Sequence, residues 1–166
     1  DQATAARKQC DALRRDGRWA DMARLLELRG DMVDDVVEAV HCYLAAADVW
    51  ERDAADLGRA MECLQRILRL EPDNAVAAEG LREFFREQGR YKDLLDLLQS
   101  QVDEEEAPHR RGELCLEVGQ VYESHLFRGR EAVRWYLRAY HDNPFLKDGA
   151  LAGVQRVFES SPQDPQ

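Results

Sequence analysis

The sequence predicts an all-α fold, an α-solenoid of antiparallel helix pairs with about nine helices. Apolar residues recur at helical spacing almost throughout the chain, and no strand-like alternation of apolar and polar residues persists. The chain also matches itself at an offset of 72 residues. A fixed period of this kind is typical of solenoids, in which each unit buries its apolar face only by stacking on its neighbours.

The 72-residue match holds at one offset without a gap. It begins with a Gly-Arg-aromatic tripeptide, continues through a leucine pair, and ends at a proline. The residues Gly17, Arg18, Trp19, Asp21, Leu25, Leu26, Trp50, Ala60 and Pro72 return as Gly89, Arg90, Tyr91, Asp93, Leu97, Leu98, Tyr122, Ala132 and Pro144.

Turn-forming residues set the ends of the first four predicted helices. Gly, Asp, Asn and Pro favour turns, and proline cannot continue a helix interior. The predicted helices are 3–15, which ends before Asp16-Gly17; 19–29, before Gly30-Asp31; 34–53, before Asp56 to Gly58; and 58–70, before Glu71 to Asn74.

The same turn chemistry sets the ends of the later helices. Loops this short require neighbouring helices to run antiparallel. The remaining helices are 75–87, which ends before Gln88-Gly89; 91–103, which reaches the first residue of the break at Asp103 to Pro108; 108–126, before Arg128-Gly129; 130–141, before Asp142 to Pro144; and 147–159.

These helices group into one predicted array over residues 1–159, followed by a tail at 160–166. The tail is rich in Ser, Pro and Gln and offers nothing to pack, so we expect it to be a disordered linker. The predicted units are 3–33, 34–74, 75–107, 108–146 and a partial unit at 147–159.

Two helix pairs share a pattern of small and aromatic residues. In one, Cys115-x2-Val118-Gly119-x2-Tyr122 precedes Ala132-x3-Tyr136-x2-Ala139-x4-Pro144; in the other, Tyr43-x2-Ala46-Ala47-x2-Trp50 precedes Ala60-x3-Leu64-x2-Ile67-x4-Pro72. A small residue in the middle of a helix allows its partner helix to approach closely. The aromatic residue one turn later fills the space beside the small one.

This pattern resembles the tetratricopeptide repeat, in a divergent, bacterial-type array. The resemblance covers residues 3–159 and is closest in the second and fourth units. It implies a right-handed superhelix whose first helices line a concave groove for partner proteins. The implied groove residues, with Arg7 and Arg14 beside them, are Asp11, His41, Leu44, Asp48, Glu51, Glu79, Glu83, Arg86, Glu113, Leu116, Gln120 and Glu123.

The acidic character of that set predicts the kind of partner. We expect a scaffold or adaptor that binds a protein or peptide with a basic segment, with Leu44 and Leu116 giving apolar contact. Tetratricopeptide domains that hold a C-terminal carboxylate use Lys, Asn and Arg at these positions. Glu79 and Glu83 would repel such a group, so that variant of the function is disfavoured.

Bulk composition narrows the function classes. The net charge is −10, which disfavours a nucleic-acid binder, and no apolar run is long enough to span a bilayer. The four cysteines form no Cys-x-x-Cys pair and lie in helical segments, as expected for a reducing, cytoplasmic compartment. The first residue is Asp1, not Met, so we expect a piece of a longer or processed chain.

No motif indicates catalysis, a metal or a cofactor. There is no Gly-rich phosphate loop, nucleophile elbow or His-Glu-x-x-His motif, and His41 beside Cys42 lacks a second ligand pair. We therefore expect no enzymatic activity. Two alternatives stay open: a spacer or regulatory segment of a larger protein without a partner of its own, and a helical ligand-binding or enzymatic domain. The sequence does not indicate the oligomeric state.

Overall fold

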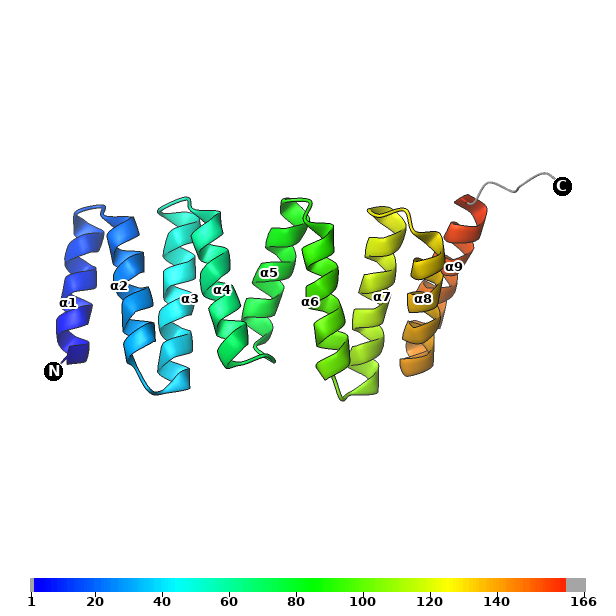
Figure 1. The fold of residues 1–166 in the computed structure, drawn as a ribbon, viewed down its shortest axis with the longest axis horizontal. Helices are drawn as coiled ribbons and strands as arrows, with labels where there is room; N and C mark the ends of the chain where they lie inside the picture. The colour runs from blue at the N-terminus through cyan, green and yellow to red at the C-terminus, as the bar shows by residue number, and fades with distance from the viewer. Residues whose placement is uncertain (1, 161–166) are drawn as a thin grey trace. The chain divides into compact units, whose positions relative to one another are not determined.

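The structure is a computed structural model that describes residues 2–160. In this range it contains α-helices and one 3-10 turn but no strand (Figure 1). The elements are α1 (Gln2–Arg15), α2 (Trp19–Met32), α3 (Val36–Arg52), α4 (Leu57–Leu70), α5 (Ala75–Glu87), α6 (Tyr91–Glu104), α7 (Pro108–Ser124), α8 (Gly129–Asp142), η1 (Pro144–Leu146) and α9 (Lys147–Ser160).

The predicted all-α fold of antiparallel helix pairs is confirmed, and each predicted helix matches an observed one. Of the predicted disordered tail, Ser160 is the last residue of α9, and residues 161–166 lie outside the described residues. The largest difference is at the end of α2, which continues through Gly30 to Met32. Gly30 does not stop the helix; it lies buried against Tyr43, where a Cβ would come within 3.0 Å of the ring.

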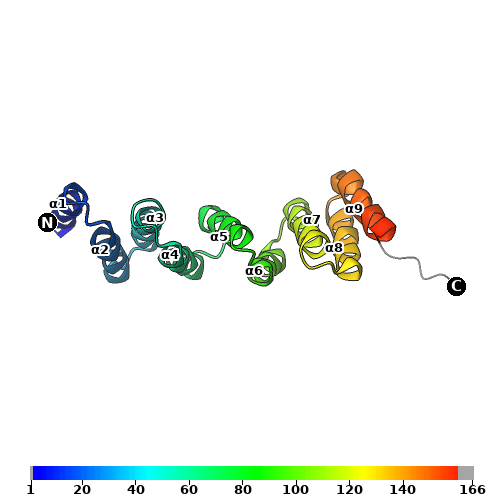
Figure 2. The same cartoon turned by 90° about the horizontal axis from the view of Figure 1, so that it is seen from above.

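The chain divides into two compact units, with the boundary between Phe84 and Phe85 inside α5. In the first unit α1 and α3 lie in one layer, and α2 and α4 lie in a second layer (Figure 2). In the second unit α7 and α9 lie in one layer, and α6 and α8 in the other (Figure 2). The members of each helix pair therefore come from different layers.

Four residues with positive φ lie in the turns that follow α1, α3, α5 and α7. Gly17 and Gly89 have φ values of +68° and +65°, and Ala55 and Phe127 have φ values of +53° and +54°. Each pair is separated by the 72-residue period. The two glycine turns also share a hydrogen bond: the Arg18 N–H donates to the Leu13 carbonyl at 2.9 Å, and the Arg90 N–H donates to the Phe85 carbonyl at 2.8 Å. This geometry is the Schellman type of helix end.

The core of the first unit forms around two aromatic residues of α3. Tyr43 and Trp50 are buried there with Ala46, Ala60 and Ile67. The Trp50 Nε1–H donates to the buried Glu27 carboxylate at 2.6 Å. The repeat places Tyr122 and Gln99 in the same two positions of the second unit, and the Gln99 amide donates to the Tyr122 hydroxyl at 3.2 Å. The 72-residue period therefore also places polar side-chain contacts between helices at equivalent positions, although the residue types differ.

The core of the second unit forms around Tyr136, which is fully buried. Glycines flank its ring: a Cβ at Gly119 would lie 2.7 Å from the ring, and a Cβ at Gly153 would lie 2.5 Å from it. Such short contacts cannot be accommodated without moving the ring. The predicted role of Gly119, to allow close approach of the second helix, agrees with this packing.

The positive-φ turns should respond in opposite directions to matched substitutions. Gly17→Ala places a Cβ in the left-handed region and should lower the free energy of unfolding by about 1 kcal/mol. Ala55→Gly relieves the same strain and should raise it by roughly 0.5–1 kcal/mol. Urea denaturation followed by circular dichroism measures both. A loss of stability in Ala55→Gly as large as that in Gly17→Ala would contradict the assigned backbone conformations.

The close packing of Gly119 against the Tyr136 ring gives a second stability prediction. Gly119→Ala should lower the free energy of unfolding by about 1–3 kcal/mol, because the new methyl group overlaps the Tyr136 ring. Gly149→Ala is the control: its Cβ would meet Leu116 at an ordinary 3.8 Å. That control should be neutral or stabilising by up to about 1 kcal/mol, as for other Gly→Ala changes in helices. Equal losses in the two variants would exclude the overlap as the cause.

Candidate functional site

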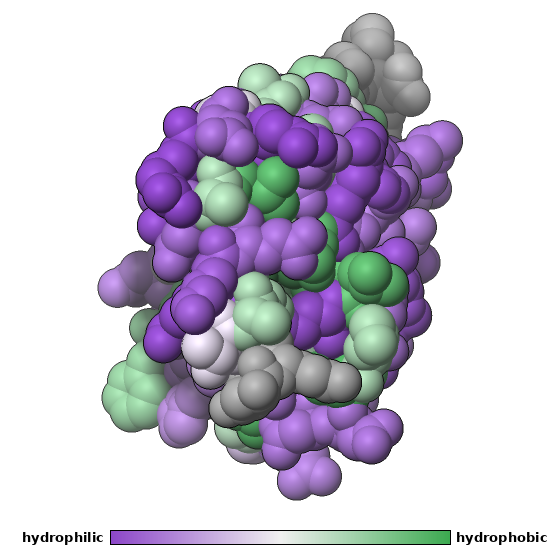
Figure 3. Space-filling model, turned by 90° about the vertical axis from the view of Figure 1, so that its left-hand side faces the viewer, coloured by the Kyte–Doolittle hydropathy of each residue, from purple (hydrophilic) through white to green (hydrophobic). Residues whose placement is uncertain are grey.

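A hollow of about 380 Å³ opens in the first unit between α1 and α3. Arg7, Asp11 and Arg14 of α1 line one side, Ala45 and Asp48 of α3 line the other, and α2 forms the floor with the apolar Met22 and Leu26. The view from the α1 end shows a mainly hydrophilic surface in which apolar residues form small separate areas (Figure 3). The hollow is thus a mostly polar depression with an apolar base.

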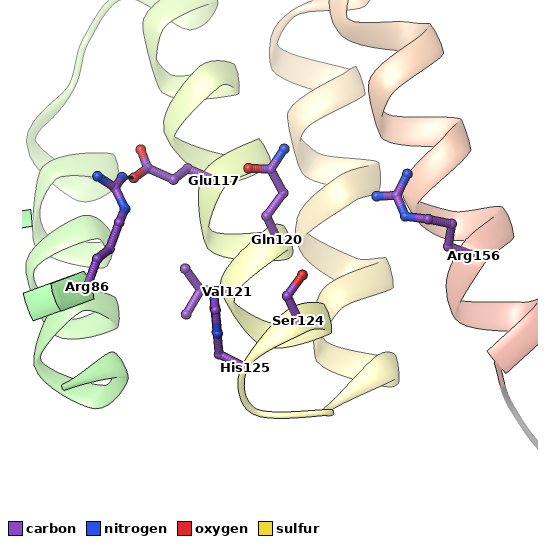
Figure 4. A pocket seen from close by; sticks show the side chains of 7 residues that line it. All are labelled: Arg86, Glu117, Gln120, Val121, Ser124, His125 and Arg156. Carbon is purple, nitrogen blue, oxygen red and sulfur yellow. Dashed lines mark hydrogen bonds and ion pairs between the residues drawn. The ribbon is translucent and has the colours of Figure 1, made fainter. Parts of the chain in front are cut away.

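A second hollow, of about 460 Å³, lies in the second unit. Arg86 from the end of α5, Glu117 and Gln120 from α7, and Arg156 from α9 line it, together with Val121, Ser124 and His125 (Figure 4). An ion pair joins Arg86 to Glu117 across one side of this hollow (Figure 4). Two of the three helices that line it, α5 and α7, carry groove residues that the tetratricopeptide resemblance implied, whereas α9 carries none.

The two hollows occupy the same place in the repeat. Adding 72 to Arg14, Ala45, Asp48 and Val49 of the first hollow gives Arg86, Glu117, Gln120 and Val121 of the second. A depression between alternate helices is therefore a recurring product of the helix arrangement. Its lining differs between the copies, since an alanine in one corresponds to a glutamate in the other.

The predicted groove residues fall into three groups. Asp11 and Asp48 line the first hollow, and Arg86 and Gln120 line the second. Leu44 and Leu116 are half-buried and pack against the cores of their units. The third group lies outside the linings of both hollows: His41, Glu51, Glu79, Glu83 and Glu113, which are exposed, and Glu123, which is half-buried.

Glu123 is held within the second unit by two partners. It accepts hydrogen bonds from Arg156 at 2.8 and 3.0 Å and from the buried Tyr136 hydroxyl. The Arg156 hydrogen bonds, with that from Tyr136, hold the pKa of Glu123 below its ordinary value despite partial burial. Burial and the neighbouring carboxylate raise the pKa of Tyr136. Glu123 therefore stabilises the packing of α7, α8 and α9.

Several lining residues could not be identified from the sequence. Glu117 was not among the predicted groove residues. The 72-residue period offered one signal for it, because Glu117 is equivalent to Ala45 and lies three residues before the predicted groove residue Gln120. Arg29, Ser124 and Arg156 carried no such signal. Arg29 lies on a second helix, and the resemblance gave no groove position at Ser124 or in the partial unit that holds Arg156.

Some charged residues that line the first hollow form ion pairs and others do not. Asp48 pairs with Arg52 at 2.9 Å, and Arg29 pairs with Glu38 at 2.5 Å. The side chains of Arg7, Asp11 and Arg14 form no ion pair or hydrogen bond with any residue that the structure describes. These three exposed groups lie on one face of α1, at spacings of four and three residues.

The cysteines are buried or half-buried in the two cores. Burial raises the pKa of the Cys63 thiol to about 12 and that of the Cys115 thiol to about 11, so both are protonated at neutral pH. Within residues 2–160 no group of three or more His, Cys, Asp or Glu side chains is arranged to hold a metal ion. No helix of that range has the length and apolar character needed to cross a bilayer.

The Glu123 ion pair should make folding sensitive to acid. A carboxylate with a lowered pKa contributes its stabilisation above the ordinary pKa, near 4.5, and loses it as the pH falls through the lowered value. Glu123→Gln should therefore lower the urea midpoint at pH 7, and its difference from wild type should shrink as the pH falls below about 4.5. Glu51→Gln changes the repeat-equivalent, exposed residue and should leave the midpoint unchanged at either pH.

No protein-family model matches the sequence, and no curated protein matches it. Two solved structures are similar to this chain. One is described as "MamA MSR-1 C2": it is 18% identical, with a TM-score of 0.52 over 95% of this chain and 86% of that one. The other is described as "MamA RS-1 ArsTM double mutant": it is 20% identical, with a TM-score of 0.49 over 99% and 98%. The first likeness supports the predicted tetratricopeptide-like fold.

Proposed function

We propose that this chain is a protein-interaction scaffold or adaptor that binds partner segments at the exposed helix faces beside its two hollows, one hollow in each unit. The observation that carries this proposal is the recurrence of an open hollow at the same position of the repeat in each unit. Both hollows are lined by alternate helices and are predominantly polar at the rim. A surface of this kind suits an extended peptide, whose backbone and side chains both need polar partners.

The partner segment is proposed to be basic. Glu51, Glu83 and Glu113 are exposed, and no described residue pairs with their carboxylates. Each lies three or four residues from a hollow-lining residue of its own helix, namely Asp48, Arg86 and Glu117, so it is on the same helical face. These carboxylates would attract Lys or Arg side chains, and the net charge of −10 would favour the encounter.

The protein is proposed to act by binding and not by catalysis. Its most buried thiols are protonated at neutral pH, and its ionised groups are mostly exposed or joined in surface ion pairs. The proposed binding surface is made of helices, whose backbone is already ordered, so binding does not require the entropy cost of ordering a loop. This favours a preformed docking surface over a spacer without a partner.

Selection from a random dodecapeptide library on the immobilised chain tests the proposal. We expect Lys and Arg to be enriched in the selected peptides, and binding to weaken as salt is raised. Replacing Glu51, Glu83 and Glu113 together by Lys should lower affinity for a selected peptide at least tenfold, about 1.4 kcal/mol.

The matched control reverses three acidic residues away from these faces, Asp73, Asp96 and Asp103, each to Lys. It changes the net charge by the same amount, so it should reduce affinity only by the general electrostatic contribution, within about threefold. Equal losses in the two triple variants would contradict a localised acidic face. Circular dichroism and urea midpoints show whether each variant is folded.

A further inference from the structure

The two hollows differ in whether one arginine has a carboxylate partner. In the second hollow Arg86 pairs with Glu117. The residues at the same positions of the first hollow are Arg14 and Ala45. The methyl group of Ala45 therefore occupies the position at which the second unit has the Glu117 carboxylate. The guanidinium of Arg14, which such a carboxylate would neutralise, is present in the first unit.

The other charged groups of the first hollow do not replace that carboxylate. Asp48 is engaged by Arg52 at 2.9 Å, and Arg29 is engaged by Glu38 at 2.5 Å. Asp11 lies between Arg7 and Arg14 along α1 but is within ion-pair distance of neither. Arg14 is exposed and lies at the rim of the hollow, so its guanidinium is accessible to a ligand.

We propose that the first hollow binds an acidic side chain of a partner segment, whose carboxylate lies over Ala45 and pairs with Arg14 as Glu117 pairs with Arg86. Arginine suits this role because its planar guanidinium can donate two parallel hydrogen bonds to one carboxylate. The apolar floor, which includes Met22 and Leu26, accommodates the methylene groups of the bound side chain. This inference rests on the proposed function and adds an acidic residue to the otherwise basic partner segment.

The carboxylate could also come from a chain terminus, and the probes separate these sources. The first probe is an acetylated, amidated octapeptide of Ala and Ser with one central Glu. The second has Gln in place of Glu, and the third has no acidic side chain but a free C-terminal carboxylate. Each is titrated into the full ¹⁵N-labelled chain, and the Nε–Hε signal of Arg14 is followed by NMR.

We expect a saturable shift of the Arg14 signal with the Glu peptide and at least fivefold weaker binding of the other two. Arg14→Gln should reduce Glu-peptide binding at least fivefold. Arg69→Gln is the control, because it removes an exposed arginine of α4 that lies in neither hollow, and it should change the affinity by less than twofold. Equal binding of the Glu and Gln peptides would overturn the proposal, and so would stronger binding of the peptide with the free C-terminus.

Two variants at Ala45 test the pairing directly. Ala45→Glu supplies the missing carboxylate and should weaken Glu-peptide binding at least fivefold, whereas Ala45→Gln, of similar size without charge, should weaken it less. Equal effects of the two Ala45 variants would overturn the proposed pairing.

The outcomes also separate this inference from the proposed function. If library-selected basic peptides bind and the Glu peptide does not, the acidic-residue site is wrong and the binding function stands. If neither class of peptide binds the folded chain, both proposals fail.

Discussion

Residues in the left-handed backbone conformation mark the ends of α1, α3, α5 and α7, and so influence which side chains each helix presents to the next. Gly17 and Gly89 end α1 and α5, and Ala55 and Phe127 follow α3 and α7. Because the reversal occurs at the same point in each copy, the following helices start in the same orientation. This is why Trp50 meets Glu27 in one unit and Tyr122 meets Gln99 in the other, although none of these residue types is shared.

Two differences between the units change the surroundings of one equivalent carboxylate. Glu51 and Glu123 are equivalent in the repeat, yet Glu51 is exposed and Glu123 is tied to Tyr136 and Arg156. The residues at the corresponding positions of the first unit are Leu64 and Phe84, which have no hydroxyl or guanidinium to donate. The same residue type is therefore a solvent-exposed group in the first unit and a hydrogen-bonded part of the helix packing in the second.

The sequence predicted the helices well because turn and core residues act locally. Proline, the αL glycines and the small residues Ala47 and Gly119 impose their effects within one helix pair. The predicted end of the second helix at residue 29 was wrong because of Gly30. The sequence alone does not distinguish a glycine that ends a helix from one that gives space to a tyrosine ring of a neighbouring helix. The ion pairs could not be predicted: Arg156 lies 33 residues from Glu123, and Arg86 lies 31 from Glu117, so their meeting depends on how the helices stack.

The difference between residues fixed by packing and residues fixed only by charge also bears on the proposed binding function. A methyl group added at Gly119 would overlap the Tyr136 ring, so the fold constrains that position. An exposed ion pair such as Arg86–Glu117 contributes only about 0–1 kcal/mol to stability, so the fold hardly depends on it. Ala45 in place of a glutamate thus leaves the helix arrangement intact while exposing the guanidinium of Arg14. Differences in specificity are therefore expected at rim positions, where charge can change without any change in packing.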